Sequence, residues 1–183
     1  MSQVSVIFHS GYGHTKKIAE IVAQSAHAKL IEINSEGDIS DTDWQTLAES
    51  DAIVFGTPTY MGGPSWQFKK FADTSSKVWF NRGWSNKLFA GFSVSGSLNG
   101  DKQMTLSYLQ TLAAQHGGLW ISLDILPANT LAATRDDLNN LGGSAGLLVQ
   151  APSDADAEAI PTGDLKTAEA FGKRINELAA KWA

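Results

Sequence analysis

The sequence contains no cysteine, carries no excess of basic residues and has no long apolar run. The absence of cysteine excludes disulfides, thiolate metal sites and cysteine nucleophiles. A nucleic-acid-binding protein should show a basic patch or a high isoelectric point, whereas the formal net charge here is −5. No stretch reaches the ~18 apolar residues that a membrane-spanning helix needs, and the first residues lack the basic and apolar regions of a signal peptide. We therefore expect a cytoplasmic protein with no membrane span and no nucleic-acid partner.

The length of the chain suits one globular domain that spans residues 1–183. A domain of this size buries roughly 70% of the surface of its unfolded chain, which is enough for a core without disulfides or metals. The 43% hydrophobic and 18% charged content is ordinary for such a domain.

The apolar pattern alternates between short buried strands and amphipathic helices. Five segments read as strands, namely Val4–Phe8, Leu30–Ile33, Asp51–Gly56, Leu88–Val94 and Leu119–Ile125. Helical spacing follows each of them, at about residues 18–28, 44–48, 68–76, 102–115 and 165–182. This alternation predicts an α/β fold, with a doubly wound parallel sheet and helices on both faces.

Three further details complete this expectation. Ser40 or Asp41 is the expected cap of the second helix. The segment from Trp79 to Asn86 reads as an ordered aromatic loop, and residues 127–162 read mostly as loop. Within that long loop, Gly146–Val149 is expected to add a short piece of strand.

The loop after the first strand has the composition of a phosphate-binding site. It runs from Ser10 to Thr15 and leads directly into a helix. Its two glycines let the backbone turn and present amides, the Ser10 and Thr15 hydroxyls add donors, and the helix N-terminus adds a partial positive charge. Such a cradle needs no lysine or arginine, although a plain tight turn remains an alternative.

Three other phosphate motifs are excluded by the residues present. No Gly-Lys-Ser/Thr closes the loop, so it is not a Walker A motif. Lys16 stands where a dinucleotide fingerprint requires its third glycine. A phospho-receiver domain should place acidic residues after the first strand, whereas this chain has His9 and Ser10 there.

Two more glycine-containing loops are expected at the same edge of the sheet. Residues 57–64 follow the third strand and can wrap a flat ring, with Tyr60 or Met61 as apolar cover. Residues 95–100 follow the fourth strand, and their amides can bond the edge of a pyrimidine-like ring. Because ligands of open parallel sheets bind at the carboxyl ends of the strands, the three loops together indicate one nucleotide site.

The chain resembles the flavodoxin superfamily over essentially its whole length. The resemblance is strongest in residues 10–15, 56–63 and 95–100. Within the superfamily the chain is closer to the tryptophan-repressor-binding-protein-like NAD(P)H:quinone oxidoreductases and the NADPH-dependent FMN reductases than to electron-carrier flavodoxins. The resemblance implies a three-layer flavodoxin-like sandwich with a five-stranded parallel sheet of order 2-1-3-4-5, and FMN as the cofactor.

The resemblance also implies which residues bind FMN. The phosphate would be held by Ser10, Gly11, Tyr12, Gly13, His14 and Thr15. The isoalloxazine ring would be contacted by Pro58, Thr59, Tyr60, Met61 and Gly62. Its pyrimidine and ribityl side would be lined by Ser95, Gly96, Ser97, Asn99 and Gly100.

Two residues are candidates for a substrate pocket, and two depart from the family's pattern. Trp79 falls where the quinone reductases place an aromatic beside the open face of the flavin, although packing of its own loop is an equal alternative. Asn99 replaces a histidine of that family and cannot titrate. Tyr60 replaces an arginine, which removes one contact to the phosphates of a nicotinamide cofactor.

The other histidines have simpler interpretations. His27 is expected to be exposed near a helix end, and His116 to lie in the last turn of a helix, where a positive charge is favourable. Neither has partners at the spacing of metal ligands, so no metal site is expected.

The expected function is transfer of electrons from NADH or NADPH through FMN to a quinone or similar acceptor. The flavin supplies the redox chemistry, and the protein binds and orients it. Two alternatives remain at this point: an electron-carrier flavodoxin without turnover of its own, and a flavin-binding regulator. The related reductases are dimers or tetramers, so a homodimer or homotetramer is expected.

Overall fold

The structure, a computed structural model, describes residues 2–183 and is built around a twisted parallel sheet. The central strands lie in the order β2-β1-β3-β5-β6 and pair in parallel. Their bounds are β1 Val4–Phe8, β2 Lys29–Glu32, β3 Ala52–Tyr60, β5 Leu88–Ser95 and β6 Leu119–Trp120. Two short strands complete the sheet: β4 (Gly63–Pro64) is antiparallel to β3, and β7 (Leu147–Gln150) is parallel to β5.

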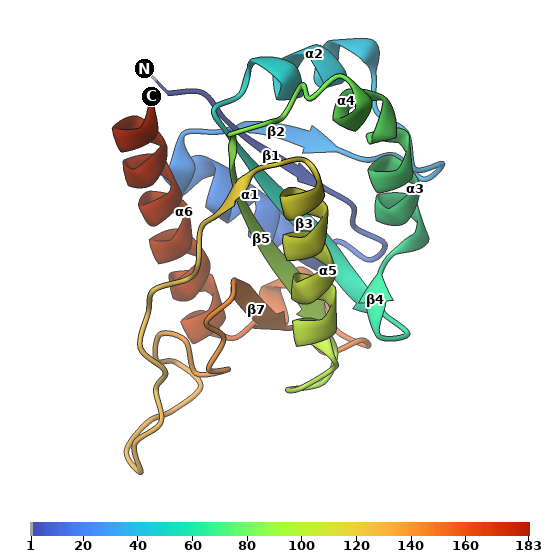
Figure 1. The fold of residues 1–183 in the computed structure, drawn as a ribbon. Helices are drawn as coiled ribbons and strands as arrows, with labels where there is room; N and C mark the ends of the chain where they lie inside the picture. The colour runs from blue at the N-terminus through green and yellow to red at the C-terminus, as the bar shows by residue number, and fades with distance from the viewer. Residues whose placement is uncertain (1) are drawn as a thin grey trace.

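Helices cover both faces of this sheet, which makes a three-layer sandwich (Figure 1). One face carries α1 (His14–Ala26) and α6 (Thr162–Trp182), which pack against each other. The other face carries α2 (Asp41–Glu49), α3 (Trp66–Thr74), α4 (Ser76–Phe80) and α5 (Lys102–Gln115). A single 3₁₀ turn, η1 (Ala157–Ala159), precedes α6. The predicted flavodoxin-like sandwich and its strand order are confirmed.

The strands are apolar throughout because both of their faces are covered. In β1, Val6 and Phe8 belong to the core beneath α1 and α6, whereas Ile7 belongs to the core beneath α2, α3 and α5. The same alternation in β3 sends Val54 to the first core and Phe55 to the second. Continuous apolar runs are the pattern of a parallel sheet buried between two helical layers.

The start of α2 confirms Ser40 as its cap. The Ser40 hydroxyl accepts from the backbone amide of Asp43 (3.2 Å), and the Asp43 carboxylate accepts from the backbone amide of Ser40 (3.1 Å). This reciprocal pair is a capping box, which satisfies two amides that the helix itself leaves free.

The last strand is divided in two, unlike the continuous strand predicted at Leu119–Ile125. β6 pairs only with the first two residues of β5, and β7 pairs with Phe92–Ser95 further along the same edge. Between them, residues 121–146 leave the sheet and form the long loop at the lower left of Figure 1. Gly146 allows β7 to enter close to β5, since a Cβ there would lie 2.5 Å from the Gly91 carbonyl oxygen. The predicted strand piece at Gly146–Val149 is thus confirmed as β7, one residue later.

Two predicted loops contain regular structure. Residues 57–60 continue β3: Thr57 and Pro58 pair with β5, whereas Thr59 and Tyr60 pair with β4 after the chain turns back through Met61 and Gly62, both at positive φ. The aromatic segment that starts at Trp79 begins inside α4, directly after α3. Over residues 2–183, no helix combines the length and the apolarity that a membrane span requires.

Candidate functional site

The carboxyl ends of β1, β3, β5 and β7 meet around one cavity of about 360 Å³. Its volume lies within the range of small-molecule sites in proteins. Its lining comes from four separate segments of the chain: Ser10, Tyr12, His14, Thr15, Pro58, Thr59, Tyr60, Val94, Ser95, Gly96, Ala151 and Ser153. The three loops that the sequence predicts to form one site therefore do converge.

The loop after β1 presents unused donors at the start of α1. The Ser10 hydroxyl accepts from the Gly13 amide (3.0 Å), and Gly13 has a φ of 89°, which only glycine adopts without strain. Among residues 2–183, no acceptor takes the amides of Gly11, Tyr12 or His14. Free amides at a helix N-terminus form a site for an anion such as a phosphate.

The segment that follows β7 covers this loop, and the sequence did not reveal it. The His14 ring nitrogen Nε2 lies 2.8 Å from the Ala155 carbonyl oxygen, and Lys17 forms an exposed ion pair with Glu158 (2.9 Å). Ala151 and Ser153 line the cavity as a result. Their position directly after a parallel strand is the signal that could have identified them. That strand, β7, is only four residues long, which makes the signal weak.

Two tyrosine rings stand at the cavity. Tyr12 and Tyr60 contact edge to face, with ring centroids 6.3 Å apart and an interplanar angle of 77°. Burial raises the pKa of Tyr60, so its hydroxyl stays protonated at neutral pH. This hydroxyl lies against Gly11, where a Cβ would approach it to 2.6 Å. The tyrosine that replaces the family's arginine thus closes onto the phosphate-loop backbone.

Thr59 lines the cavity, but its hydroxyl points into the core and forms hydrogen bonds there. Its hydroxyl is hydrogen-bonded to Ser93 and to Thr105, both at 2.7 Å, and Ser93 in turn donates to the Thr57 carbonyl (2.9 Å). This buried chain of hydroxyls joins β3, β5 and α5 directly below the site. It stiffens the strand ends that carry the cavity.

Several predicted site residues do not line the cavity. Met61 and Gly62 form the exposed turn between β3 and β4, and Asn99 lines a different cavity with Arg135. The remaining loop residues outside the lining are Gly11, Gly13, Ser97 and Gly100. The two glycines of the first loop still shape its backbone.

Trp79 is far from this site within the chain. It lies in α4 and lines a cavity of about 210 Å³ together with Leu112 and His116. Those two residues end α5, which begins at the cavity edge of the sheet and runs to the opposite edge. Within one chain, α3 therefore separates Trp79 from the cavity at the strand ends.

His9 adds a buried histidine beneath the loop. It is 4% exposed, and its Nδ1 atom has no hydrogen-bond partner among the described residues. Burial lowers its pKa, while the nearby Glu32 carboxylate acts in the opposite direction. The neutral form is therefore favoured at neutral pH.

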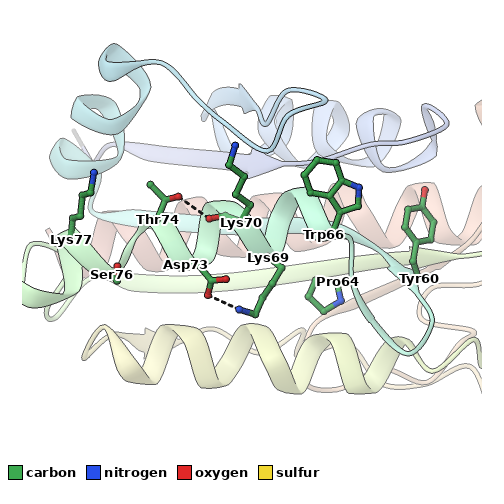
Figure 2. A pocket seen from close by; sticks show the side chains of 9 residues that line it. All are labelled: Tyr60, Pro64, Trp66, Lys69, Lys70, Asp73, Thr74, Ser76 and Lys77. Atoms are coloured by element: carbon green, nitrogen blue, oxygen red, sulfur yellow. Dashed lines mark hydrogen bonds and ion pairs between the residues drawn. The ribbon is translucent and has the colours of Figure 1, made fainter.

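A second, open groove of about 890 Å³ begins at Tyr60 and follows α3 (Figure 2). Trp66 stands near its Tyr60 end, and Lys77 stands at the far end. Lys69 is paired with Asp73 (2.5 Å) and Lys70 with Asp38 (2.8 Å). Among residues 2–183, Lys77 forms no ion pair. Tyr60 is common to the groove and the cavity.

Comparison with known structures places the fold in one class. The chain aligns over its full length with the crystal structure of a flavodoxin, WrbA-like protein from Agrobacterium tumefaciens, over all of that chain, at 46% identity and a TM-score of 0.84. An archaeal flavodoxin aligns over 97% of this chain and 99% of its own at 17% identity and a TM-score of 0.64, a likeness of fold alone. The fold is that of a flavodoxin-like protein.

Sequence relatives define the family more narrowly. Residues 9–123 match the family described as NADPH-dependent FMN reductase, and the chain belongs to this family. It is 55% identical over 178 residues to flavodoxin FldP from Pseudomonas aeruginosa, with 97% of each chain covered. It is 30% identical over 204 aligned positions to an NAD(P)H dehydrogenase (quinone) from Chromohalobacter salexigens, with both chains fully covered.

Proposed function

We propose that the cavity binds FMN and that the protein passes electrons from NAD(P)H through this flavin to a quinone or similar small acceptor. The phosphate would bind the free amides of Gly11, Tyr12 and His14 and the hydroxyls of Ser10 and Thr15. The unused donors of this loop at the start of α1 are what a phosphate on a helix N-terminus requires. The family match and the relatives named as flavodoxins support the same cofactor.

The flavin ring would lie between the β3 end at Pro58–Tyr60 and the loop that begins at Ser95. Bound FMN supplies the redox chemistry, because it accepts a hydride and returns its electrons to an acceptor. The residues of this chain bind and orient it. Tyr12 and Tyr60 exclude water beside it, and the amides of residues 96–99 offer hydrogen bonds to its polar edge.

The observation that carries the proposed donor and acceptor is the open groove that shares Tyr60 with the cavity. A flavin occupies most of a 360 Å³ cavity, so a second substrate has to approach from the surface. The groove supplies an aromatic side chain, Trp66, and the cationic side chains of Lys69 and Lys77 beyond it. Such a sequence of groups suits a nicotinamide ring followed by its phosphates.

A second candidate function is that of an electron carrier. It is favoured by the 55% identical relative that is named a flavodoxin and by the exposed apolar side chains near the site, Tyr12 and Met61. A carrier docks on protein partners and needs no nicotinamide site. The third reading, a flavin-binding regulator, has no specific observation in its favour.

One preparation separates these candidates. The purified protein is loaded with FMN, mixed anaerobically with NADH or NADPH, and then given benzoquinone while the flavin absorbance is followed. The proposed enzyme bleaches with one nicotinamide and recovers its colour with the quinone. Flavin that neither nicotinamide bleaches, but that dithionite does, supports the carrier instead. A protein that binds no FMN contradicts both.

The groove has its own test. Lys77→Ala should raise the Michaelis constant for the nicotinamide with little change in FMN affinity, because Lys77 lies only in the groove. Lys166→Ala is the matched control, since Lys166 is an exposed lysine of α6 on the opposite face of the sheet. Equal effects of the two substitutions would contradict the proposed nicotinamide position.

The oligomeric state is likewise a proposal. Phe80 in α4 is 80% exposed and Trp79 beside it is 52% exposed, which suits contact with a second copy of the chain. We expect a dimer or tetramer by sedimentation velocity, and Phe80→Asp should shift it toward the monomer. A monomer at all concentrations would contradict the proposed contact.

A further inference from the structure

Lys102 is a fully buried lysine behind the loop that follows β5. It is the first residue of α5 and has no exposed surface. Its ammonium group donates to the Ser95 hydroxyl (2.9 Å) and to the backbone carbonyl oxygens of Ser97 (2.8 Å), Leu98 (3.0 Å) and Asn99 (3.0 Å). Four acceptors thus surround a group that has three donors.

These bonds orient the peptide groups of the loop. In a trans peptide the carbonyl oxygen and the amide hydrogen of the next residue point in opposite directions. Because the carbonyls of Ser97, Leu98 and Asn99 point toward Lys102, the amides of the residues that follow them point away from it. Among residues 2–183, no acceptor takes these amides, which belong to Leu98, Asn99 and Gly100. Lys102 therefore holds a row of donors that no protein group uses.

Lys102 supplies most of the hydrogen bonds that this loop makes, beside those of Gln150 to the Gly96 carbonyl and of the Asp101 amide to the Asn99 side chain. Ser95 borders the cavity, and Gly100 ends the loop at a φ of 54°. A Cβ at Gly100 would collide with the Ser95 hydroxyl, so the chain passes directly over the group that Lys102 binds. Residues 95–100 have three polar side chains, two glycines and an exposed Leu98, so the loop buries little apolar area and is held by its bonds to the buried ammonium.

The charge of Lys102 is kept without a direct ion pair. Burial lowers its pKa to about 8, and the carboxylate of Asp164 on α6 partly opposes this, whereas Arg135 of the 121–146 segment adds to it. Asp101, the exposed residue before it, is the other charged group on the same element. At neutral pH the ammonium form still predominates, so its four acceptors are bound by a cation.

We propose that Lys102 is a positioning residue for the flavin ring: by binding the Ser95 hydroxyl and the carbonyls of residues 97–99 it fixes the loop that borders the cavity at Ser95 and Gly96, so that free amides of this loop are available to the polar edge of the isoalloxazine. The role rests on the proposed FMN site, and no contact between Lys102 and the flavin is required. It differs from a phosphate-binding role, because the loop that it holds lies beyond β5 and not at the start of α1.

The test measures the affinity of the apoprotein for FMN and for riboflavin, which lacks the phosphate, by quenching of flavin fluorescence. Lys102→Met should weaken both flavins by the same factor, at least fivefold, because only the ring side of the site changes. Lys102→Gln, which keeps two neutral donors, should lose less than Lys102→Met. A loss below fivefold, or one confined to FMN, overturns the proposal.

A matched variant separates positioning from general loss of structure. Lys87 is a half-buried lysine at the opposite edge of the sheet. Like that of Lys102, its ammonium binds backbone carbonyls, here those of Ala48 and Ser50. Lys87→Met should leave both flavin affinities unchanged, and an equal loss in this variant overturns the proposal. If the wild-type protein binds neither flavin, the proposed function itself fails. If the wild type binds flavin and Lys102→Met binds it equally well, only the role of Lys102 fails.

The pH profile gives a readout that a purely structural role would not move. The wild-type affinity for riboflavin should fall between pH 7 and pH 9.5 as Lys102 loses its charge, whereas the affinity of Lys102→Gln should not show this component. Identical profiles for the two proteins would overturn the role of the ammonium.

Discussion

His116 shows how burial changes the role of a single titratable residue. The sequence indicated a cation in the last turn of a helix, but the side chain is 5% exposed, stacks on Trp84 and shares a hydrogen bond with the Ser75 hydroxyl (2.9 Å). Ser75 already donates to Ala72, so His116 is the donor in this bond and its Nδ1 atom is left unprotonated. Burial lowers the pKa of His116 to about 4. The prediction of a helix-end charge is therefore wrong.

This histidine should make the stability depend on pH. Its pKa in the folded protein is lower than the unfolded value of 6.5, so its contribution is complete above pH 6.5 and is lost as the pH falls toward 4. The full shift corresponds to about 3 kcal/mol. Urea unfolding between pH 7 and pH 4 should show this loss in the wild type and not in His116→Gln. His27→Asn is the control, because His27 is exposed and lies at a φ of 52° that asparagine tolerates; the same effect there would contradict the assignment.

Gly13 carries a second prediction at this scale. A Cβ at Gly13 would meet nothing within 4 Å, so Gly13→Ala changes only the backbone strain at a φ of 89°. We expect about 1–2 kcal/mol of destabilisation and a larger loss of affinity for FMN than for riboflavin, because the loop that relaxes faces the phosphate. The measurement is a flavin titration of both ligands with each variant.

Gly142→Ala provides the matched control for that substitution. Gly142 also has a positive φ, 70°, and a Cβ there would make only an ordinary contact with the Pro127 Cβ (3.8 Å), but it lies in the 121–146 segment. A similar destabilisation with unchanged flavin affinity is expected. Loss of FMN affinity in both variants would mean that strain in general, and not the loop at Gly13, controls binding.

The candidate site could be predicted from the sequence where it is formed by the backbone of the loops. Glycine spacing and hydroxyls at strand ends located the loops at Ser10, Pro58 and Ser95, because these signals are local. Side-chain direction is not local: the Thr59 hydroxyl turns into the core to meet Ser93, and Lys102 turns back over its own loop. Neither arrangement has a signature in the sequence.

Among the elements, the contact between α1 and α6 is set by one glycine. A Cβ at Gly172 would lie 2.7 Å from both the Ser25 Cβ and the Val22 carbonyl oxygen. The two helices therefore approach closely enough to exclude a methyl group. Both helices are anchored by buried side chains such as Ile18 and Phe171, so they cannot separate without exposing a core.

Gly172→Ala should destabilise the protein even though alanine favours a helix. Helix propensity alone would add about 1 kcal/mol of stability, whereas overpacking a closed contact costs about 1–3 kcal/mol. The free energy of unfolding measured by urea titration should therefore fall. The sign of the change in the free energy of unfolding is the test, because a more stable variant would show that the two helices move apart without cost.

The elements were predictable where their apolar period is clear. Strands and helices with a clear apolar period, such as Val4–Phe8 and Lys102–Gln115, were located to within a residue. The edge strand was misjudged because Ile121 and Leu123 are buried in the core without joining a sheet ladder. Burial and strand pairing produce the same apolar alternation, so the sequence does not distinguish them.

At the scale of the whole molecule, the site joins distant parts of the chain. Residues near 10, 58, 95 and 151 share one cavity, so a ligand there connects four strand ends. FMN at a hundredfold excess over its dissociation constant should add about 2.7 kcal/mol to the free energy of unfolding. Thermal unfolding with and without FMN measures this, and adenosine monophosphate serves as a control for a phosphate alone. No stabilisation by FMN would contradict the proposed cofactor.

The division of the last strand has a consequence for how this fold tolerates change. Residues 121–146 connect β6 to β7, and both of these strands pair with β5. The sheet therefore fixes both ends of the segment. Doubling the length of such a closed excursion costs only about 0.6 kcal/mol of chain entropy. The part of the segment without buried residues, 126–134, can therefore be lengthened, while Ile121, Leu123 and Asn139 stay packed and β7 still delivers Ala151 and Ser153 to the cavity.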